Sequence, residues 1–285
     1  MPTEDRLAVS KTYKLYIGGK FPRTESGRYF ELKGRKDVLL ANVSLASRKD
    51  FRNAVVAARK ALSGWAGATA YLRGQILYRM AEMLEGRAEQ FEAELKSQGS
   101  TPAAARKEVA AAVDLLVHYA GWSDKFQALF SSVNPVSSPH FNFSMPEPVG
   151  VVGAVAPEGS GLLGLVSVIA PIVVGGNSCV VLASRNKPLC AVTLAEVLNS
   201  SDLPGGVVNI LTGEREELLG QFASHMDVNA LVLCSDDSAE IKRAQTEAAE
   251  NVKRVSLHPD APLEGSPYHI LDAQEIKTTW HPVGV

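Results

Sequence analysis

Residues 149–257 alternate between two hydrophobic patterns. Short runs that are continuous in valine, isoleucine and leucine are separated by longer runs with apolar residues at helical spacing. Parallel strands that are buried on both faces have this pattern, because helices cover both sides of their sheet. The pattern predicts strands at 149–156, 178–183, 206–211, 229–234 and 251–257, and helices at 161–174, 188–200, 214–224 and 237–249.

The first half of the chain has a different pattern. Residues 13–32 predict two short strands around a glycine turn. From residue 49 onward, apolar residues recur every three to four positions, as in amphipathic helices, and Asp50 is placed to cap the first helix. Three further helices are predicted at 72–84, 88–98 and 103–130.

Together these elements predict an α/β fold, a doubly wound parallel sheet with an N-terminal helical half. In such sheets ligands bind beyond the carboxyl ends of the strands. The candidate chemistry is therefore expected in the loops that follow the strands, at residues 157–161, 183–186, 212–215, 235–238 and 258–260.

Composition narrows the function classes. The chain has 285 residues with a formal net charge of −2, so it has no basic field to attract nucleic acid or an anionic membrane. Its three cysteines do not form a disulfide framework, which favours a reducing compartment. The first residues lack the apolar core of a signal peptide. We expect a cytoplasmic protein with no nucleic-acid or membrane partner.

Five segments of the second half carry motifs in a specific order, namely EPVGVVGAVAP (147–157), APIVVGGNSCVV (170–181), LPGGVVNILTG (203–213), HMDVNALVL (225–233) and VKRVSL (252–257). In order and spacing they resemble the nucleotide-binding core of the aldehyde dehydrogenase superfamily. The first half resembles it too, in KLYIGGKF (14–21) and AVVAARKALSGWAG (54–67). The resemblance reaches His258 and implies the fold of the family's cofactor-binding domain.

The resemblance also implies that the catalytic positions are degenerate. The family's oxyanion-stabilising asparagine corresponds to Gly159, which follows Glu158, and a carboxylate there opposes catalysis. The general-base glutamate corresponds to His258. The family's nucleophilic cysteine lies further on, whereas this chain has no cysteine after Cys234. We expect a pseudoenzyme without catalytic residues, in which the catalytic domain is absent.

The cofactor positions differ as well. Leu182 and Arg185 replace the lysine and glutamate that hold the ribose hydroxyls in the family, and Arg215 follows a run where the family has a second glycine. Ser235 and Asp236 replace the glycine and serine whose backbone N–H groups receive the pyrophosphate. Each carboxylate of the acidic pair 236–237 would cost about 3 kcal/mol beside a docked phosphate. NAD binding is therefore predicted to be lost, with no other cofactor.

Residues 137–147 alternate apolar and polar side chains, as a strand with one apolar face does. The resemblance implies that they form an oligomerisation arm with residues 272–285, leaving 1–136 and 148–262 as the nucleotide-binding-fold domain. A lone two-stranded ribbon is marginal in water, so the arm needs a partner. The alternative is a pair of terminal edge strands packed on their own domain. The predicted interface residues are Phe141, Phe143, Met145, Ile276, Thr278 and Trp280.

Three functional hypotheses follow. The first is a non-catalytic module for assembly or partner binding, as a homodimer or with another aldehyde dehydrogenase module. The second is a binding module with residual affinity for a nucleotide or another small ligand, in which Arg185 and Arg215 hold an anion. The third is an aldehyde dehydrogenase subunit completed in trans. The six histidines have no metal-ligand spacing, and two aspartates beside Cys234 disfavour a Cys234–His258 dyad.

Overall fold

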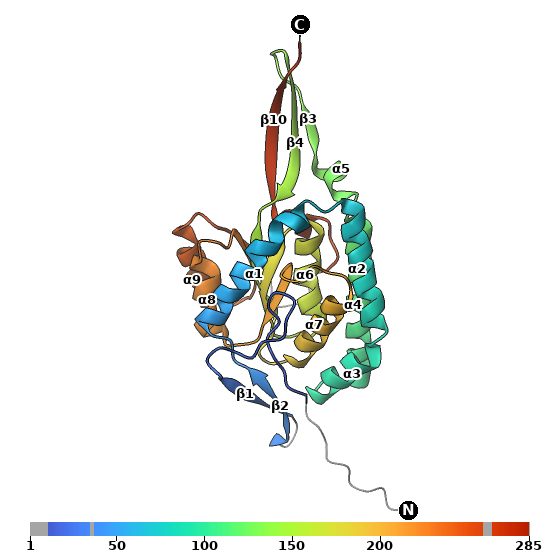
Figure 1. Cartoon of the computed structure of the whole chain (residues 1–285), viewed down its shortest axis with the longest axis vertical. Helices are drawn as coiled ribbons and strands as arrows, with labels where there is room; N and C mark the ends of the chain where they lie inside the picture. The colour runs from blue at the N-terminus through green and yellow to red at the C-terminus, as the bar shows by residue number, and fades with distance from the viewer. Residues whose placement is uncertain (1–10, 35–36, 259–263, 285) are drawn as a thin grey trace, which may run out of the picture.

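The computed structural model of the chain describes residues 11–34, 37–258 and 264–284. Figure 1 shows a body of helices around a sheet, from which a narrow arm of strands projects. The sheet has five parallel strands in the order β7-β6-β5-β8-β9. The predicted doubly wound α/β fold is confirmed. The strands are β5 (Val151–Val155), β6 (Ser178–Leu182), β7 (Val208–Leu211), β8 (Ala230–Cys234) and β9 (Arg254–His258).

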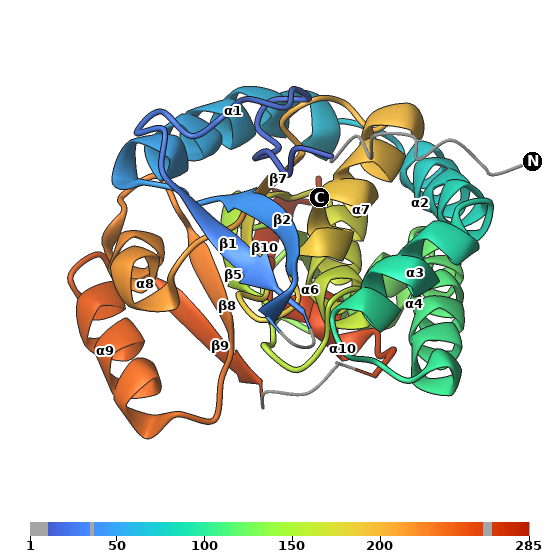
Figure 2. The same ribbon diagram turned by 90° about the horizontal axis from the view of Figure 1, so that it is seen from below.

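Helices cover both faces of this sheet (Figure 2). One face packs against α1 (Arg48–Ala66), α8 (Arg215–Ser224) and α9 (Ser238–Ala249). The other packs against α6 (Leu163–Val174) and α7 (Leu189–Ser200). Outside these two helices lie α2 (Ala70–Glu85), α3 (Ala88–Ser97) and α4 (Pro102–Trp122). The helical first half is therefore part of the layers around the sheet.

The central strand explains why both layers are needed. All five residues of β5 are buried, and its side chains alternate between two apolar clusters. Val151 and Val155 pack in the cluster that includes Phe51 of α1, whereas Val152 and Ala154 pack in the cluster that includes α6. None of the helices in the described part of the chain combines the length and the apolar character that crossing a membrane requires.

The N-terminal strands differ from the prediction. Residues 13–19 form only isolated bridges, one of which joins Tyr16 to Ile210 of β7. The hairpin forms further along the chain, where β1 (Tyr29–Lys33) pairs with β2 (Leu39–Ser44). Gly18 and Gly19 have positive φ and turn the chain sharply back, which leaves the preceding segment too short to form a ladder of its own.

The predicted helix at 103–130 is interrupted. α4 ends at Trp122, and a separate short helix, α5 (Phe126–Phe130), follows it. The Lys125 ammonium donates a hydrogen bond at 2.6 Å to the carbonyl of Gly121, satisfying an orphan acceptor in the last turn of α4.

The arm is a three-stranded antiparallel sheet in the order β10-β4-β3. The two predicted strands pair with each other along nine residues each, and the third strand was not predicted. A short helix, α10 (Tyr268–Leu271), leads into the last strand. Residues 1–10, 35–36, 259–262 and 285 of the predicted domains lie outside the described residues. The arm strands are β3 (Ser132–Asn134), β4 (His140–Pro148) and β10 (Gln274–Pro282).

Asp50 stabilises the start of α1, although it is not the N-cap. Ser47 is the N-cap, and Asp50 is the N3 residue of a capping box that accepts the Ser47 N–H at 2.8 Å. The same carboxylate accepts hydrogen bonds from the Thr24 hydroxyl at 2.7 Å and the Glu25 N–H at 3.0 Å. Burial alone would raise the pKa of Asp50, but these hydrogen bonds outweigh it and lower the pKa.

We expect Asp50→Asn to lower the free energy of unfolding at pH 7 by about 1–3 kcal/mol, because the carboxylate accepts several hydrogen bonds while buried. A lowered pKa contributes stability that is present above the ordinary value and is lost as pH falls through the lowered one. The deficit of the variant should therefore shrink below about pH 4. Urea denaturation at several pH values measures it.

Asp114→Asn is the matched control, because Asp114 is exposed on α4. It should change stability by no more than about 0.5 kcal/mol. Equal effects of the two substitutions would contradict the role assigned to Asp50.

Candidate functional site

The carboxyl end of the parallel sheet is where ligands bind in doubly wound folds. Glu158 follows β5 there, and its carboxylate turns toward the loop after β6. It accepts hydrogen bonds from the Arg185 N–H at 2.9 Å, the Asn186 N–H at 3.1 Å and the Ser184 hydroxyl at 3.1 Å. Glu158, which is expected to oppose catalysis, thus also binds the loop that follows β6.

Arg215, the first residue of α8, pairs with two carboxylates. Its Nε lies 2.9 Å from Glu158 Oε1, and its Nη1 lies 3.2 Å from Glu240 Oε2. A further hydrogen bond reaches the carbonyl of Ala156. The Ser235 hydroxyl also donates to Glu240, at 2.7 Å. These interactions join the ends of β5, β7 and β8. The Arg215 side chain is only 12% exposed, so the ion pairs lie in a poorly solvated site.

Arg185 is held in a second ion pair. Its Nε lies 2.6 Å from Glu214 Oε1, and its guanidinium stacks 3.4 Å above the ring of Phe30 in β1. The hairpin thus packs across the carboxyl end of the sheet. We refer to Glu158, Arg185, Glu214, Arg215, Ser235 and Glu240 as the carboxyl-end network.

Two helix N-termini at this end receive carboxylates of the chain itself. Glu108 of α4 accepts the N–H groups of Leu162 at 2.9 Å and Leu163 at 3.3 Å, where α6 begins. Asp237 caps α9 by accepting the N–H of Ala239 at 2.8 Å. Helix N-termini favour anions, and here protein carboxylates occupy part of that donor capacity.

The remaining predicted positions do not join this network through their side chains. Leu182 is fully buried in the core, and Asp236 is exposed. The carbonyl of Gly159 accepts a hydrogen bond from Lys187 Nζ at 2.9 Å. Cys234 is fully buried opposite His258 in the β8–β9 register.

His258 belongs to another cluster. Its Nε2 lies 2.9 Å from Asp272 Oδ2, and His269 Nδ1 lies 3.7 Å from the same oxygen. Burial acts to raise the pKa of Asp272, but the two histidines outweigh it and lower the pKa to about 2. The spacing of histidines in the sequence did not predict this cluster, because His258 is separated along the chain from His269 and Asp272.

Comparisons with known proteins agree with this fold. The sequence profile described as the aldehyde dehydrogenase family matches residues 23–261. The chain belongs to the aldehyde dehydrogenase family. It is 30% identical over 258 residues to an aldehyde dehydrogenase of Aspergillus niger, covering 90% of this chain and 51% of that protein. It is 31% identical over 259 residues to the cytosolic 10-formyltetrahydrofolate dehydrogenase of Mus musculus, covering 88% and 29% respectively.

Solved aldehyde dehydrogenases share the fold. An NAD⁺ complex of the Bacillus cereus enzyme superposes with a TM-score of 0.82 at 26% identity, covering 87% of this chain and 50% of that one. PnpE from Pseudomonas sp. WBC-3 gives a TM-score of 0.83 at 25% identity. The chain therefore spans about half the length of the aldehyde dehydrogenases that it matches, and less of the formyltetrahydrofolate enzyme.

The register of the arm in this aldehyde dehydrogenase-family chain separates the predicted interface residues. Val133 and Thr279 pair with Phe143, whereas Trp280 pairs with Asn142. Because directly paired residues share a face, the two predicted apolar stripes lie on opposite faces of the arm sheet. One face carries Val133, Phe141, Phe143 and Met145, and the other carries Asn134, Asn142, Ser144, Ile276, Thr278 and Trp280.

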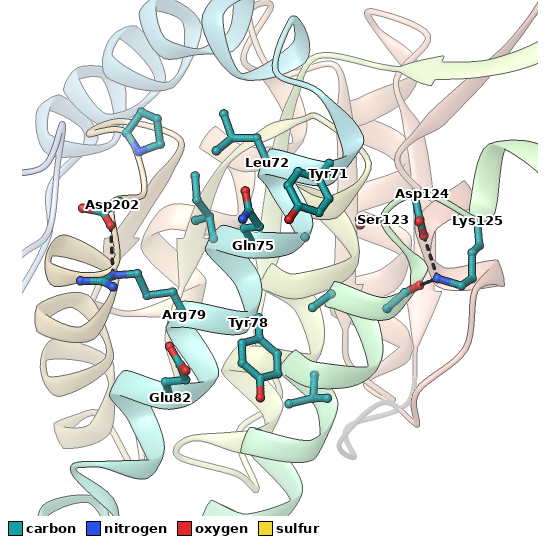
Figure 3. Close-up of a pocket in the computed structure, with 16 residues that line it drawn as sticks. Tyr71, Leu72, Gln75, Tyr78, Arg79, Glu82, Ser123, Asp124, Lys125 and Asp202 are labelled. Carbon is teal, nitrogen blue, oxygen red and sulfur yellow. Dashed lines mark hydrogen bonds and ion pairs between the residues drawn. The ribbon is translucent and has the colours of Figure 1, made fainter.

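A hollow on the helical side of the body lies between α2 and α4 (Figure 3). It has a volume of about 870 Å³. Tyr71 and Tyr78 line it and are exposed, and Arg79 Nε pairs with Asp202 Oδ2 at 3.0 Å on one side. The hollow was not predicted from the sequence, and none of its lining residues belongs to the carboxyl-end network.

We expect Arg215→Gln to lower the free energy of unfolding by about 2–3 kcal/mol, because it leaves two partly buried carboxylates without their cation. Chemical denaturation measures the loss. Arg79→Gln, which removes an arginine that is 49% exposed, should cost less than about 1 kcal/mol. Adding Glu158→Gln to Arg215→Gln should cost less than the sum of the single substitutions, and strict additivity would contradict the pairing.

Proposed function

We propose that this chain is a non-catalytic aldehyde dehydrogenase-like module that serves assembly or partner binding and does not bind NAD. The carboxyl-end network is the observation that carries the proposal. Arg185, Arg215 and Ser235, at positions where the resemblance implies cofactor contacts, each bind a carboxylate of the chain itself. The chain's own charges thus occupy the place where a cofactor would need open hydrogen-bond donors.

The electrostatics of the network support the loss of NAD. Arg185 and Arg215 are both paired with carboxylates, so neither cation is available to an anion without breaking an ion pair. Hydrogen bonds to charged groups contribute about 1.5–3 kcal/mol each. A pyrophosphate would have to displace several of them while facing Glu158, Glu240 and Asp236, which argues against residual nucleotide affinity.

The catalytic positions support the absence of aldehyde oxidation. Oxyanion stabilisation needs donors that are placed in advance, and Gly159 has no side-chain amide. The position that corresponds to the family's general-base glutamate holds no carboxylate but His258, whose Nε2 is hydrogen-bonded to Asp272.

The arm supports a role in assembly. Phe141 is 45% exposed and Val133 is 67% exposed on a sheet that projects from the body (Figure 1). With Phe143 and Met145 they line a hollow of about 360 Å³ on one face of the arm. Exposed, contiguous apolar surface on a protein is typical of an interaction site. The proposed partner is a second copy of the chain or another aldehyde dehydrogenase module.

A thermal melt with NAD⁺ and NADP⁺ up to several millimolar tests the loss of cofactor binding. Ligand at a hundredfold excess over Kd would add about 2.7 kcal/mol to stability, which shifts Tm visibly. We expect no shift for this chain and a clear shift for a catalytically active aldehyde dehydrogenase measured in parallel. A saturable shift for this chain would contradict the proposal.

The same samples test completion in trans. Aldehyde-dependent formation of NADH is measured for this chain alone, for the active homologue alone and for their mixture. We expect no rate for this chain, and a mixture rate equal to that of the homologue. A higher rate in the mixture would favour a catalytic role.

Light scattering coupled to size exclusion tests the arm. We expect the chain to be a dimer or larger, and the double substitution Phe141→Asp and Phe143→Asp to shift it to the monomer, because two charges would be buried at the interface. Tyr71→Asp, in the hollow between α2 and α4, is the control and should leave the oligomer intact. An oligomer that survives the arm substitutions would show that it forms elsewhere.

A further inference from the structure

Three side chains of metal-ligating types converge where β9 ends, beside the segment that leads into the arm. His258 is the last residue of β9, His269 lies in α10, and Asp272 follows that helix directly. The two imidazole rings are 5.1 Å apart between centroids. One ligand atom from each residue lies within 4.8 Å of the other two. Three side chains from two elements thus surround one small volume.

The donor set matches the preferences of zinc. Zn²⁺ binds imidazole nitrogen and carboxylate oxygen at about 2.0–2.2 Å, so tetrahedral ligand atoms stand roughly 3.3 Å apart. The separations of 2.9 Å from Asp272 Oδ2 to His258 Nε2 and 3.7 Å to His269 Nδ1 lie on either side of that value. Movements of a few tenths of an ångström would bring these two pairs to a zinc geometry.

The hydrogen-bonded pair engages only two of the three side chains. The contact between His258 and Asp272 is a hydrogen bond. His269 Nδ1, at 3.7 Å from the same oxygen, is beyond ordinary hydrogen-bond length, yet it lies beside the pair. A cation between the three atoms would engage both imidazoles and the carboxylate together. The side chains are 13%, 22% and 27% exposed, so solvent reaches them.

We propose that His258, His269 and Asp272 form a Zn²⁺ site with three protein ligands and a fourth position open to water. Its place in the fold assigns it a structural role. His258 ends β9, an edge strand of the parallel sheet, and Asp272 stands two residues before the arm strand β10. The ion would fasten the segment that leads into β10 to the end of β9.

The neighbouring contacts show what such a site would reinforce. Ile270, between the two α10-side ligands, is fully buried in the core. Arg254 of β9 donates to the carbonyl of Gln274, and the Gln274 amide donates to the carbonyl of Gly175 at 3.1 Å. The ion would add a bond between elements that already meet, so it stabilises a preformed junction.

Calorimetric titration of the chelator-stripped chain with ZnCl₂ at neutral pH tests the site. We expect one Zn²⁺ per chain and a rise in Tm on binding. Co²⁺ should bind in its place and give visible absorption bands of a low-coordinate, imidazole-ligated ion. His258→Gln, His269→Gln and Asp272→Asn should each weaken Zn²⁺ binding by at least roughly a hundredfold, because each removes a direct ligand.

His225→Gln is the matched control, because His225 follows α8 and lies outside the cluster. It should bind Zn²⁺ as the unaltered chain does. Equal weakening by the control, or titration of the unaltered chain without a stoichiometric site, would overturn the proposal.

A measurement on the unaltered chain keeps the test independent of folding in the variants. Diethyl pyrocarbonate modifies accessible imidazoles, and bound Zn²⁺ should protect His258 and His269 from it while leaving His225 unchanged. Equal modification of all three histidines with and without saturating Zn²⁺ would also overturn the proposal.

Discussion

A parallel sheet must be buried on both faces, and the rest of this structure is arranged around that requirement. The side chains of β5, β6 and β8 are entirely buried. Because successive side chains point to opposite faces of the sheet, each face needs an apolar layer packed against it. The helices that connect successive strands supply part of both layers. One of these layers is extended by α1, which packs against β6 and β7. This packing fixes the directions of the strands and therefore sets where their carboxyl ends converge.

The convergence has an electrostatic consequence. Helices that follow parallel strands direct their positive N-termini toward the carboxyl end of the sheet, which attracts negative charge of any origin. Here Glu108 and Asp237 supply it from the chain. Once Glu158 is also present, a cation is needed nearby, because a partly buried carboxylate without a partner is costly. Arg215 meets that need, so the two substitutions are best understood as a pair.

Periodicity predicted most of the second half, because continuous apolar strands and amphipathic helices have distinct patterns there. It failed where structure depends on partners distant in sequence. β3 is three residues long, too short to leave a pattern, and the partner of β1 is set by a turn. The sequence placed Glu158 and Arg215 at the same end of the sheet, but their ion pair, and that of Arg215 with Glu240, depend on side-chain positions that no spacing encodes.

The arm lies at the other end of the sheet. β4 leads directly into the amino end of β5, whereas the carboxyl-end network and the β1–β2 hairpin occupy the opposite end (Figure 1). On one arm face, Asn134 donates to Asn142 at 2.6 Å, and the Ser144 and Thr278 hydroxyls lie 2.8 Å apart, so polar side chains bind one another within the arm. Both faces expose apolar side chains that gain from being covered, Val133 and Phe141 on one and Ile276 and Trp280 on the other. A partner docked there would not touch the carboxyl end, so assembly and cofactor chemistry are separable, and one can persist when the other is lost.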